Sequence, residues 1–327
     1  MKKRFSLSIV MCFIAVFVFC LGFSNQALAK EGWPKTTVNI IVGYNPGGST
    51  DTFARLLAKH LEPVFGHPVV VQNVPGGGGA VGYVKTMTSK PDGYTVVVSN
   101  GSLLTLGGIG NVDFQYSDFT NLGRVIVEDE TICVGKDAPW NNVAELIAYS
   151  KENPGKLRIG FAGIGGFTYL AANQFIKTAG IEIDGIGYSS GAEAVAGLLG
   201  GFVDVIVQQP GEIFSHWQGG EVKILGTMGE VRHVLFPDVM TCEEQGLNLK
   251  LFQWRGISGP KNMPEDIKAA WIDALDKVQQ SEAFRKDITE ILCAGTSFIG
   301  GDDFEDWLKK EADWIYPLID ELGLKQK

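Results

Sequence analysis

Residues 37–51 read TVNIIVGYNPGGSTD, and this stretch decides the fold. Its first six residues form an apolar, β-branched run of the kind that makes a buried strand. Gly47 and Gly48 then turn the chain, and from Ser49 onward the apolar residues recur at helical spacing. A strand followed at once by a turn and a helix is the unit from which parallel sheets with helices on both faces are built.

The same order of strand, turn and helix recurs along the chain. The first part predicts strands and helices in alternation over residues 37–42, 49–63, 68–71, 80–89 and 94–98. A later part repeats the alternation over residues 156–161, 167–178, 183–188, 192–199 and 203–207. The fold class is therefore α/β, with two units that are each a mostly parallel sheet flanked by helices.

The C-terminal third predicts helices over 264–280, 281–289 and 302–322, with a strand over 291–298. We expect this part to return to the first unit. The chain then crosses between the units twice, near 125–135 and 248–258, and two crossings make a hinge. The expected division is residues 30–129 plus 253–327 for domain 1 and residues 130–252 for domain 2.

The N-terminus carries the pattern of an export signal. Lys2, Lys3 and Arg4 precede a long apolar run, and Ala27-Leu28-Ala29 gives a small-x-small cleavage site. An uncleaved membrane anchor is the alternative, because about 20 apolar residues span a bilayer. The cleavage site favours a signal peptide over residues 1–29, cut after Ala29, and hence a periplasmic protein.

Composition excludes several classes of function. The chain has 28 basic and 37 acidic residues, and removal of the signal peptide would take away only basic ones. An acidic protein without a basic patch is a poor partner for nucleic acid, so none is expected. Beyond the signal peptide, Cys133, Cys242 and Cys293 lack metal-binding spacing, which leaves one disulfide or three buried thiols open. Neither a metal nor another cofactor is expected.

Two loop–helix junctions share one physical design. Residues 44–51 and 162–168 each place glycines between the end of a strand and the start of a helix. The first turn of a helix has unpaired N–H groups and a partial positive charge, so it binds anions. Ser49, Thr50 and Thr168 would add hydroxyl donors. Asp51 fits two roles, a structural pair with Arg55 or a contact to the ligand.

Two other motifs suggest enzymes. Residues 77–82 contain G-x-G-x-x-G, but they follow the second strand and lack the acid that a dinucleotide site needs. Residues 187–191 match the G-x-S-x-G of a nucleophile elbow, with Asp204 and His216 or His233 downstream. A serine hydrolase that uses Ser189 is therefore the alternative function.

Several short motifs together resemble the extracytoplasmic solute receptors of the tripartite tricarboxylate transporter family, also called Bug-type receptors. They include GGSTDTFAR at 47–55, VQNVPGGGG at 71–79, PDGYT at 91–95 and WRGISGP at 254–260. The resemblance implies a two-domain periplasmic-binding-protein fold, which closes on its ligand like a flytrap. It also implies a carboxylate ligand and partners consisting of one large and one small integral membrane subunit. We expect a monomer that performs no catalysis.

The resemblance places the ligand at four loops. The first-lobe loops supply Tyr44, Asn45, Gly47, Gly48, Ser49, Asp51, Ser99, Asn100 and Ser102. The second-lobe loops supply Gly163, Gly165, Gly166, Phe167, Thr168, Tyr188 and Ser189. Phe167 and Tyr169 stand where the family commonly has small polar residues and His, and a common Lys is missing beside Tyr188. A more aromatic, less basic wall favours a monocarboxylate or a semi-apolar dicarboxylate, including aromatic ones, over citrate.

Overall fold

The computed structural model describes residues 32–326. The expected signal peptide and its cleavage site lie outside these residues. The fold described below lies within the unit Thr36–Lys327. Among residues 32–326, none of the helices combines the length and apolar character needed to cross a membrane.

The first sheet has six strands in the order β11-β4-β10-β3-β1-β2. They are β1 (Val38–Val42), β2 (Val69–Asn73), β3 (Thr95–Asn100), β4 (Phe119–Asp129), β10 (Phe252–Pro260) and β11 (Gly295–Gly300). β1 runs parallel to β2 and β3, as the sequence predicts. β10, β4 and β11 continue the sheet in antiparallel pairs, so the sheet is mixed.

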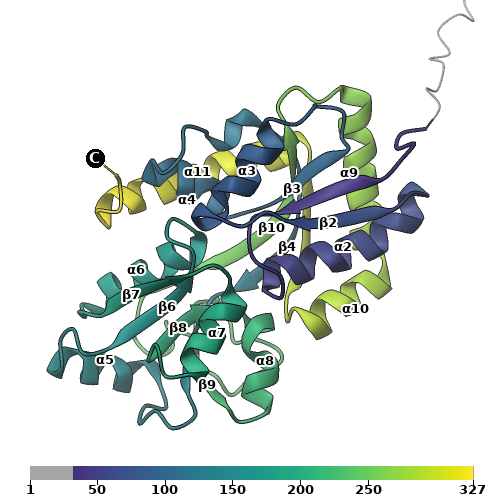
Figure 1. Ribbon diagram of the computed structural model, residues 1–327. Coiled ribbons are helices and arrows are strands. Elements are labelled where there is room, and N and C mark those ends of the chain that lie inside the picture. The colour runs from purple at the N-terminus through teal and green to yellow at the C-terminus, as the bar shows by residue number, and fades with distance from the viewer. Residues whose placement is uncertain (1–31, 327) are drawn as a thin grey trace, which may run out of the picture. The chain divides into compact units, whose positions relative to one another are not determined.

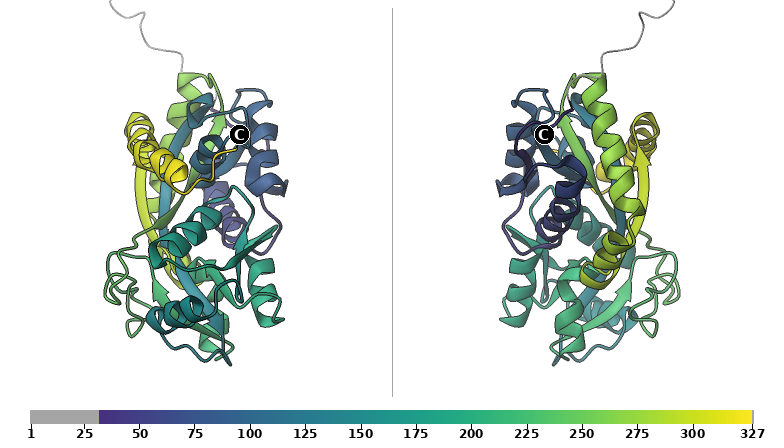
Figure 2. Two further views of the ribbon diagram at one scale, coloured as in Figure 1. Left: turned by 90° about the vertical axis from the view of Figure 1, so that its left-hand side faces the viewer. Right: turned by 90° about the vertical axis from the view of Figure 1, so that its right-hand side faces the viewer.

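Helices cover both faces of this first sheet (Figures 1 and 2). They are α2 (Ser49–Phe65), α3 (Ala80–Met87), α4 (Ser102–Ile109), α9 (Glu265–Gln280), α10 (Glu282–Ile291) and α11 (Asp302–Glu321). α2, α9 and α10 pack against one another on one face, and α11 packs against α4 on the other. These elements form the first lobe.

The second sheet has five strands in the order β7-β6-β8-β5-β9. Its strands are β5 (Thr131–Gly135), β6 (Arg158–Ala162), β7 (Asp184–Tyr188), β8 (Val205–Gln208) and β9 (Val222–Thr227). Its helices are α5 (Val143–Glu152), α6 (Phe167–Ala179), α7 (Gly191–Leu199) and α8 (Pro210–Gln218). β6 runs parallel to β7 and β8, whereas β5 is antiparallel to both of its neighbours. These elements form the second lobe.

The chain passes between the lobes at two places. Glu130 alone separates β4 from β5, and residues 228–251 lead from β9 back to β10. Both lie at or next to the segments expected to form a hinge. The antiparallel strands of both sheets are the crossing strands and their neighbours, which explains why the sheets are mixed. The division into domains at residues 129, 130, 252 and 253 stays a prediction.

Local sequence explains where the elements begin and end. α2 stops at Gly66, whose φ of 67° is left-handed and whose N–H bonds the carbonyl of Glu62. The strand expected over 291–298 begins only at Gly295, because α10 runs on to Ile291 and buries Phe284 and Ile288. Cys133, Cys242 and Cys293 are all buried free thiols, which decides the open question of the disulfide.

Candidate functional site

The two lobes meet over a small hollow, here called the cleft cavity, with a volume of about 20 Å³. The first lobe contributes Tyr44, Gly48, Ser49, Thr50, Asn100, Gln253 and Arg255. The second lobe contributes Ala162, Phe167, Thr168, Ser190, Gly191, Gln209 and Glu212. One water needs roughly 10–15 Å³, so the cavity is nearly filled by protein side chains.

Direct contacts hold the lobes together around this cavity. A Cβ added to Gly101 of the first lobe would lie 2.2 Å from the ring of Phe167 in the second. A Cβ added to Gly78 would lie 2.6 Å from the carbonyl oxygen of Ile164. Only glycine permits this approach of ring to backbone and of backbone to backbone. The structure is therefore a closed form of the two-lobed fold.

The N-terminus of α2 receives a carboxylate from the opposite lobe. The N–H of Ser49 donates to Oε1 of Glu212 on α8 at 2.7 Å. Gly48, the N-cap residue, has no side chain to serve as a cap. A Cβ on Gly48 would lie 3.1 Å from the same Oε1, and one on Gly191 would lie 2.2 Å from it. The Glu212 carboxylate thus lies at the N-termini of α2, which begins at Ser49, and of α7, which begins at Gly191.

A buried ion pair adjoins this carboxylate. Arg255 on β10 pairs with Glu128 on β4, and Glu128 also accepts a 2.9 Å bond from the hydroxyl of Ser49. The side chains of Arg255 and Glu128 are 2% and 0% exposed. Burial lowers the pKa of Arg255 to about 9. The guanidinium remains charged at neutral pH and is the cation that lines the cleft cavity among the described residues.

Two further buried carboxyl groups lie beside the pair. Burial raises the pKa of Glu212 to about 7, although the Ser49 N–H opposes this rise. Burial also raises the pKa of Glu130 to about 8, and its neighbours Glu212 and Asp129 add to the effect. Glu130 accepts a 2.7 Å bond from the side chain of Gln209, which itself lines the cavity. This side of the cleft is thus rich in buried carboxyl groups whose burial disfavours the charged form.

The N-terminus of α6 is satisfied by a neutral group from the first lobe. The N–H of Phe167 donates to the hydroxyl oxygen of Ser102 at 3.2 Å, and Ser102 also bonds the hydroxyl of Tyr44 at 2.7 Å. Burial raises the pKa of Tyr44, so its hydroxyl stays protonated. The hydroxyl of Thr168 bonds the backbone of Ala162 within its own lobe.

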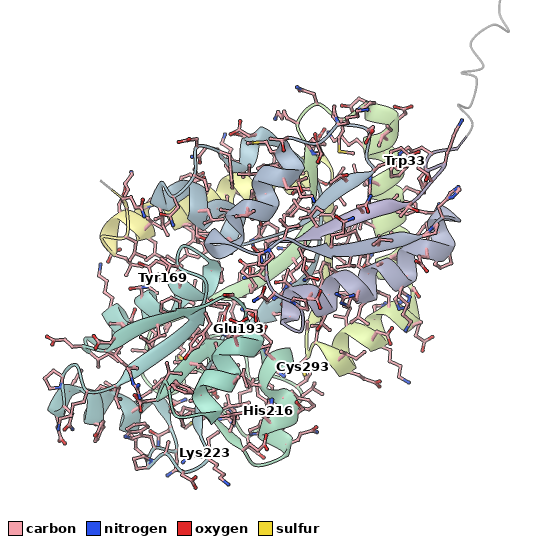
Figure 3. All side chains as sticks on the ribbon, viewed as in Figure 1. Trp33, Tyr169, Glu193, His216, Lys223 and Cys293 are labelled. Atoms are coloured by element: carbon pink, nitrogen blue, oxygen red, sulfur yellow. The ribbon has the colours of Figure 1, made fainter. Side chains whose placement is uncertain are left out.

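The N-terminus of α7 is capped by its own chain. The side chain of Ser190 accepts the N–H of Glu193, and the carboxylate of Glu193 accepts the N–H of Ser189 at 3.1 Å. Glu193 also reaches the first lobe, where it accepts a 2.6 Å bond from the side-chain amide of Asn45. Figure 3 marks Glu193 where the second lobe meets the first.

The expected ligand residues fall into three groups. Those that line the cleft cavity are Tyr44, Gly48, Ser49, Asn100, Phe167 and Thr168. A neighbouring hollow of about 400 Å³ is lined by Tyr44 again and by Asn45, Gly163, Tyr188 and Ser189. Lining neither are Gly47, Asp51, Ser99, Ser102, Gly165 and Gly166. The structure therefore gathers most of the predicted set at one interface.

Asp51 takes the structural role of the two that the sequence allows. Burial opposes its ionisation, but bonds from Arg55, the N–H of Gly47 and Asn73 outweigh burial and lower its pKa. Its two oxygens are used by these three donors. Both carboxylate oxygens of Asp51 are therefore engaged within the first lobe.

Tyr169 does not form part of the aromatic wall. Its ring packs against Phe161, another residue of the second lobe, at 5.1 Å between centroids. Two residues along a helix point to nearly opposite faces, so only Phe167 of this pair reaches the cleft.

Sequence reasoning missed the two charged side chains that line the cavity, Glu212 and Arg255, and Glu128, the partner of Arg255. Glu212, Glu128 and Arg255 come from α8, β4 and β10, none of which begins with a glycine-rich loop. The available signal was an arginine directly after Trp254, inside a strand that has no other charged residue. A charged residue in such a strand demands a buried partner.

The hydrolase alternative finds no support in the contacts of its residues. Asp204 bonds the backbone N–H of Arg158, and His216 pairs with Glu221 at 2.6 Å. His233 bonds the carbonyl of Cys293. Each acid or base of the supposed triad is thus engaged away from Ser189, whereas catalysis would need them within hydrogen-bond reach of one another.

Comparison with known proteins gives a consistent result. Residues 53–323 match the family model described as tripartite tricarboxylate transporter family receptor. Protein BugT of Bordetella pertussis is 29% identical over 275 residues, covering 83% of this chain and 84% of BugT. A protein encoded in the gbd 5' region of Cupriavidus necator is 28% identical over 281 residues, covering 85% of each chain.

Solved structures agree in fold. The periplasmic binding protein BugD matches with a TM-score of 0.86 at 27% identity, covering 90% of this chain and 100% of its own. An R. palustris protein solved with adipate matches with a TM-score of 0.85 at 22% identity, covering 89% and 99%. The two-domain binding-protein fold predicted from the sequence is thereby confirmed.

Proposed function

Because this chain belongs to the tripartite tricarboxylate transporter family of solute receptors, we propose that it captures a small carboxylate between its two lobes. Solved proteins of this fold include the periplasmic binding protein BugD and a TctC solute binding protein from Polaromonas. The chain acts by binding and closing, without a catalytic step. The ligand is a monocarboxylate or a semi-apolar dicarboxylate, because Phe167 lines the cavity and Arg255, its one cation among the described residues, is already paired.

One observation carries this proposal. The N-terminus of α2 holds a carboxylate already, namely that of Glu212, at 2.7 Å from the N–H of Ser49. A helix N-terminus that begins with glycine and faces a cleft has donors and positive charge to offer an anion. Each hydrogen bond to a charged group contributes about 1.5–3 kcal/mol, so a few such bonds account for micromolar affinity, about 8 kcal/mol.

Ligand capture requires the lobes to separate. Pockets for small molecules usually measure about 300–1,000 Å³; the neighbouring hollow of about 400 Å³ has that size, but the cleft cavity at the N-termini of α2 and α6 measures only about 20 Å³. A ligand therefore enters an open form and is enclosed when rotation about the crossings brings α2 and α6 together. Closure is favoured because the ligand then contacts both lobes at once.

The remaining features of the proposal concern export, domain motion, partners and the loops that contact the ligand. The protein is exported to the periplasm, where residues 30–129 plus 253–327 and residues 130–252 move as two domains. It acts as a monomer and delivers its ligand to one large and one small integral membrane subunit. The glycine-rich first-lobe loop, the Gly101 region and the α6 and α7 junctions contact the ligand.

A thermal-shift screen of the chain from Lys30 against a carboxylate library tests the proposal. A ligand at 100 times its dissociation constant raises the unfolding free energy by about 2.7 kcal/mol, which is a shift of several degrees. Citrate should bind more weakly than the best monocarboxylate. No shift with any carboxylate would contradict the proposal. Turnover of a chromogenic ester that is lost in Ser189→Ala would favour the hydrolase instead.

A further inference from the structure

A second cavity, here called the hinge pocket, lies where the chain passes between the lobes. It has a volume of about 640 Å³, which is within the range usual for small-molecule sites. Its wall includes the end of β4, residues 228–231 and 250–252 at the two ends of the second crossing, residues 293–295, and Trp314 of α11. Both crossings of the chain thus border one pocket.

Alternation along β4 separates the hinge pocket from the cleft cavity. Successive side chains of a strand point to opposite faces of its sheet. Glu128 points to its partner Arg255, which lines the cleft cavity, so Val127 and Asp129 point to the other face. Asp129 lies opposite Phe252 of β10, and both line the hinge pocket. The pocket is therefore a site of its own rather than a branch of the cleft.

The carboxyl group of Asp129 lies in this pocket without a bonded partner. Burial raises its pKa and the charge of a protonated His233 would lower it, while no hydrogen bond from residues 32–326 contributes. The carboxylate packs on the backbone of Gly229, where an added Cβ would lie 2.6 Å from Oδ2. Both oxygens of Asp129 are thus available as acceptors.

Two of the basic side chains that line the pocket are engaged elsewhere. Arg124 donates to the carbonyl and the hydroxyl oxygen of Ser297. Lys250 pairs with Glu243 at 2.9 Å. Neither of these cations therefore neutralises Asp129.

His233 is the remaining basic side chain among the described residues that line the pocket. Its Nδ1 accepts the N–H of Leu235, and its Nε2 donates to the carbonyl of Cys293 at 2.8 Å. One accepting and one donating nitrogen is the arrangement of the neutral ring. The negative charge of Asp129 is therefore uncompensated within the described part of the chain.

The rest of the wall suits an apolar group. Leu251 lines the pocket, as do the rings of Phe252 and Trp314, which are 39% and 38% exposed. Aromatic rings attract cations as well as apolar groups. An ammonium group can donate to the Asp129 carboxylate and cancel its charge. A metal ion does not fit, because no group of three or more His, Cys or acidic side chains among residues 32–326 is arranged to hold one.

We propose that the hinge pocket binds a small organic cation, with its ammonium group on the carboxylate of Asp129 and its apolar body against Phe252 and Trp314. The site is separate from the one between the lobes, so the proposal goes beyond the carboxylate-receptor function and does not depend on it. The occupant would contact both crossings of the chain.

Amines and alcohols of the same carbon skeleton test the proposal on the unaltered protein. The amines are 2-phenylethylammonium and 4-phenylbutylammonium, and the alcohols are 2-phenylethanol and 4-phenylbutan-1-ol. By calorimetric titration, the better amine should bind about tenfold more tightly than its alcohol, which cannot form the charge-assisted bond. Ethylammonium should bind about tenfold more weakly than the better amine, because it lacks the apolar body.

Two variants locate the amine. Asp129→Asn keeps the shape of the side chain but removes its charge, so the affinity for the better amine should fall about tenfold. Gly295→Leu fills the pocket instead: a Cβ at Gly295 meets only Val127, at 3.9 Å, so the backbone accepts the change and the longer side chain takes up the space of the ligand. Asp137→Asn is the control, because it makes the same change at an exposed residue that lines neither cavity.

Full affinity for the amine in either folded variant, Asp129→Asn or Gly295→Leu, overturns the proposal, because the amine then binds elsewhere. Equal binding of the amine and its alcohol also overturns it, and so does the absence of binding by both amines. Thermal unfolding checks that each variant folds, and Asp129→Asn decides alone if Gly295→Leu does not. None of these results bears on the receptor function, which the carboxylate screen tests separately.

Discussion

The helices α2 and α7 begin at the same cleft from opposite lobes, but their first turns are satisfied in different ways. α7 begins after Ser190, whose hydroxyl caps the helix from within its own lobe. α2 begins after Gly48, which offers no cap, and its Ser49 N–H is taken by Glu212 across the cleft. The Ser190 cap forms within one lobe and does not depend on closure, whereas the contact of Glu212 with α2 does.

α6 resembles α2 in this respect, but with a neutral partner. Its N-cap is Gly166, and its Phe167 N–H is taken by the hydroxyl of Ser102 from the first lobe. The cleft thus has a charged side at α2 and a neutral side at α6. The difference indicates that the contacts at α2 select ligands by charge, whereas those at α6 select them by shape.

The largest effect should follow from removing Arg255, the buried cation on the charged side of the cleft. Arg255→Met leaves Glu128 buried without its counter-ion, so the unfolding free energy should fall by about 3–5 kcal/mol in urea denaturation. Glu128→Gln combined with Arg255→Met should recover more than half of this loss, because no unpaired charge remains. A loss below about 1 kcal/mol in the single variant would show that Glu128 is not held as an ion.

The charged side should also make stability depend on pH. Burial raises the pKa of Glu130 to about 8 and that of Glu212 to about 7, from an ordinary value of 4.5. Between pH 4.5 and 8 the folded state therefore binds more protons than the unfolded state, and the unfolding free energy falls as pH rises. The contribution is fully present below pH 4.5 and is lost by about pH 8.

Thermal unfolding of the ligand-free protein across pH 4.5–8 measures this slope. The double variant Glu130→Gln, Glu212→Gln should flatten it, because the glutamine side chains do not titrate. The ion pair of Glu128 and Arg255 remains in that variant and serves as an internal reference. A wild-type melting temperature that rises from pH 5 to pH 8 would be inconsistent with buried, protonated carboxyl groups here.

A smaller effect should come from obstructing the neutral side. Gly101→Ala places a methyl group 2.2 Å from the ring of Phe167, while the φ of Gly101, −51°, suits alanine. The lobes should then close incompletely, and ligand affinity should fall about tenfold without loss of folding. Gly135→Ala is the control, because no atom lies within 4 Å of its added methyl. Unchanged affinity and unchanged ligand-induced compaction in small-angle scattering would contradict this account.

The sequence could predict the parts of the fold that rest on local pattern. The strand–glycine–helix junctions at α2 and α6 begin at Ser49 and Phe167 as expected, because glycine and periodicity are readable in short windows. The free state of the three cysteines was not readable, since it depends on which side chains the fold brings near one another.

The charged side of the cleft lay beyond sequence reasoning for a physical reason. Glu128 and Arg255 meet because β4 and β10 pair antiparallel so that Glu128 lies opposite Gln253, two residues from Arg255 on the same strand. Glu212 reaches Ser49 only because α8 and α2 face each other across two lobes. Register and lobe placement are set by the whole core, so a residue's neighbours in sequence carry no sign of them.

The smallest expected effect is the difference in ligand affinity between removing a helix cap within one lobe and removing one that crosses the cleft. Ser281→Ala removes the hydroxyl that caps α10 away from the cleft and should cost about 1 kcal/mol of unfolding free energy, with ligand affinity unchanged. Ser102→Ala makes the same chemical change but removes the acceptor that the first lobe offers to Phe167. Since that bond exists only in the closed form, Ser102→Ala should weaken ligand binding several-fold, as measured by calorimetric titration. Equal affinities in the two variants would mean that caps across the cleft are not coupled to closure.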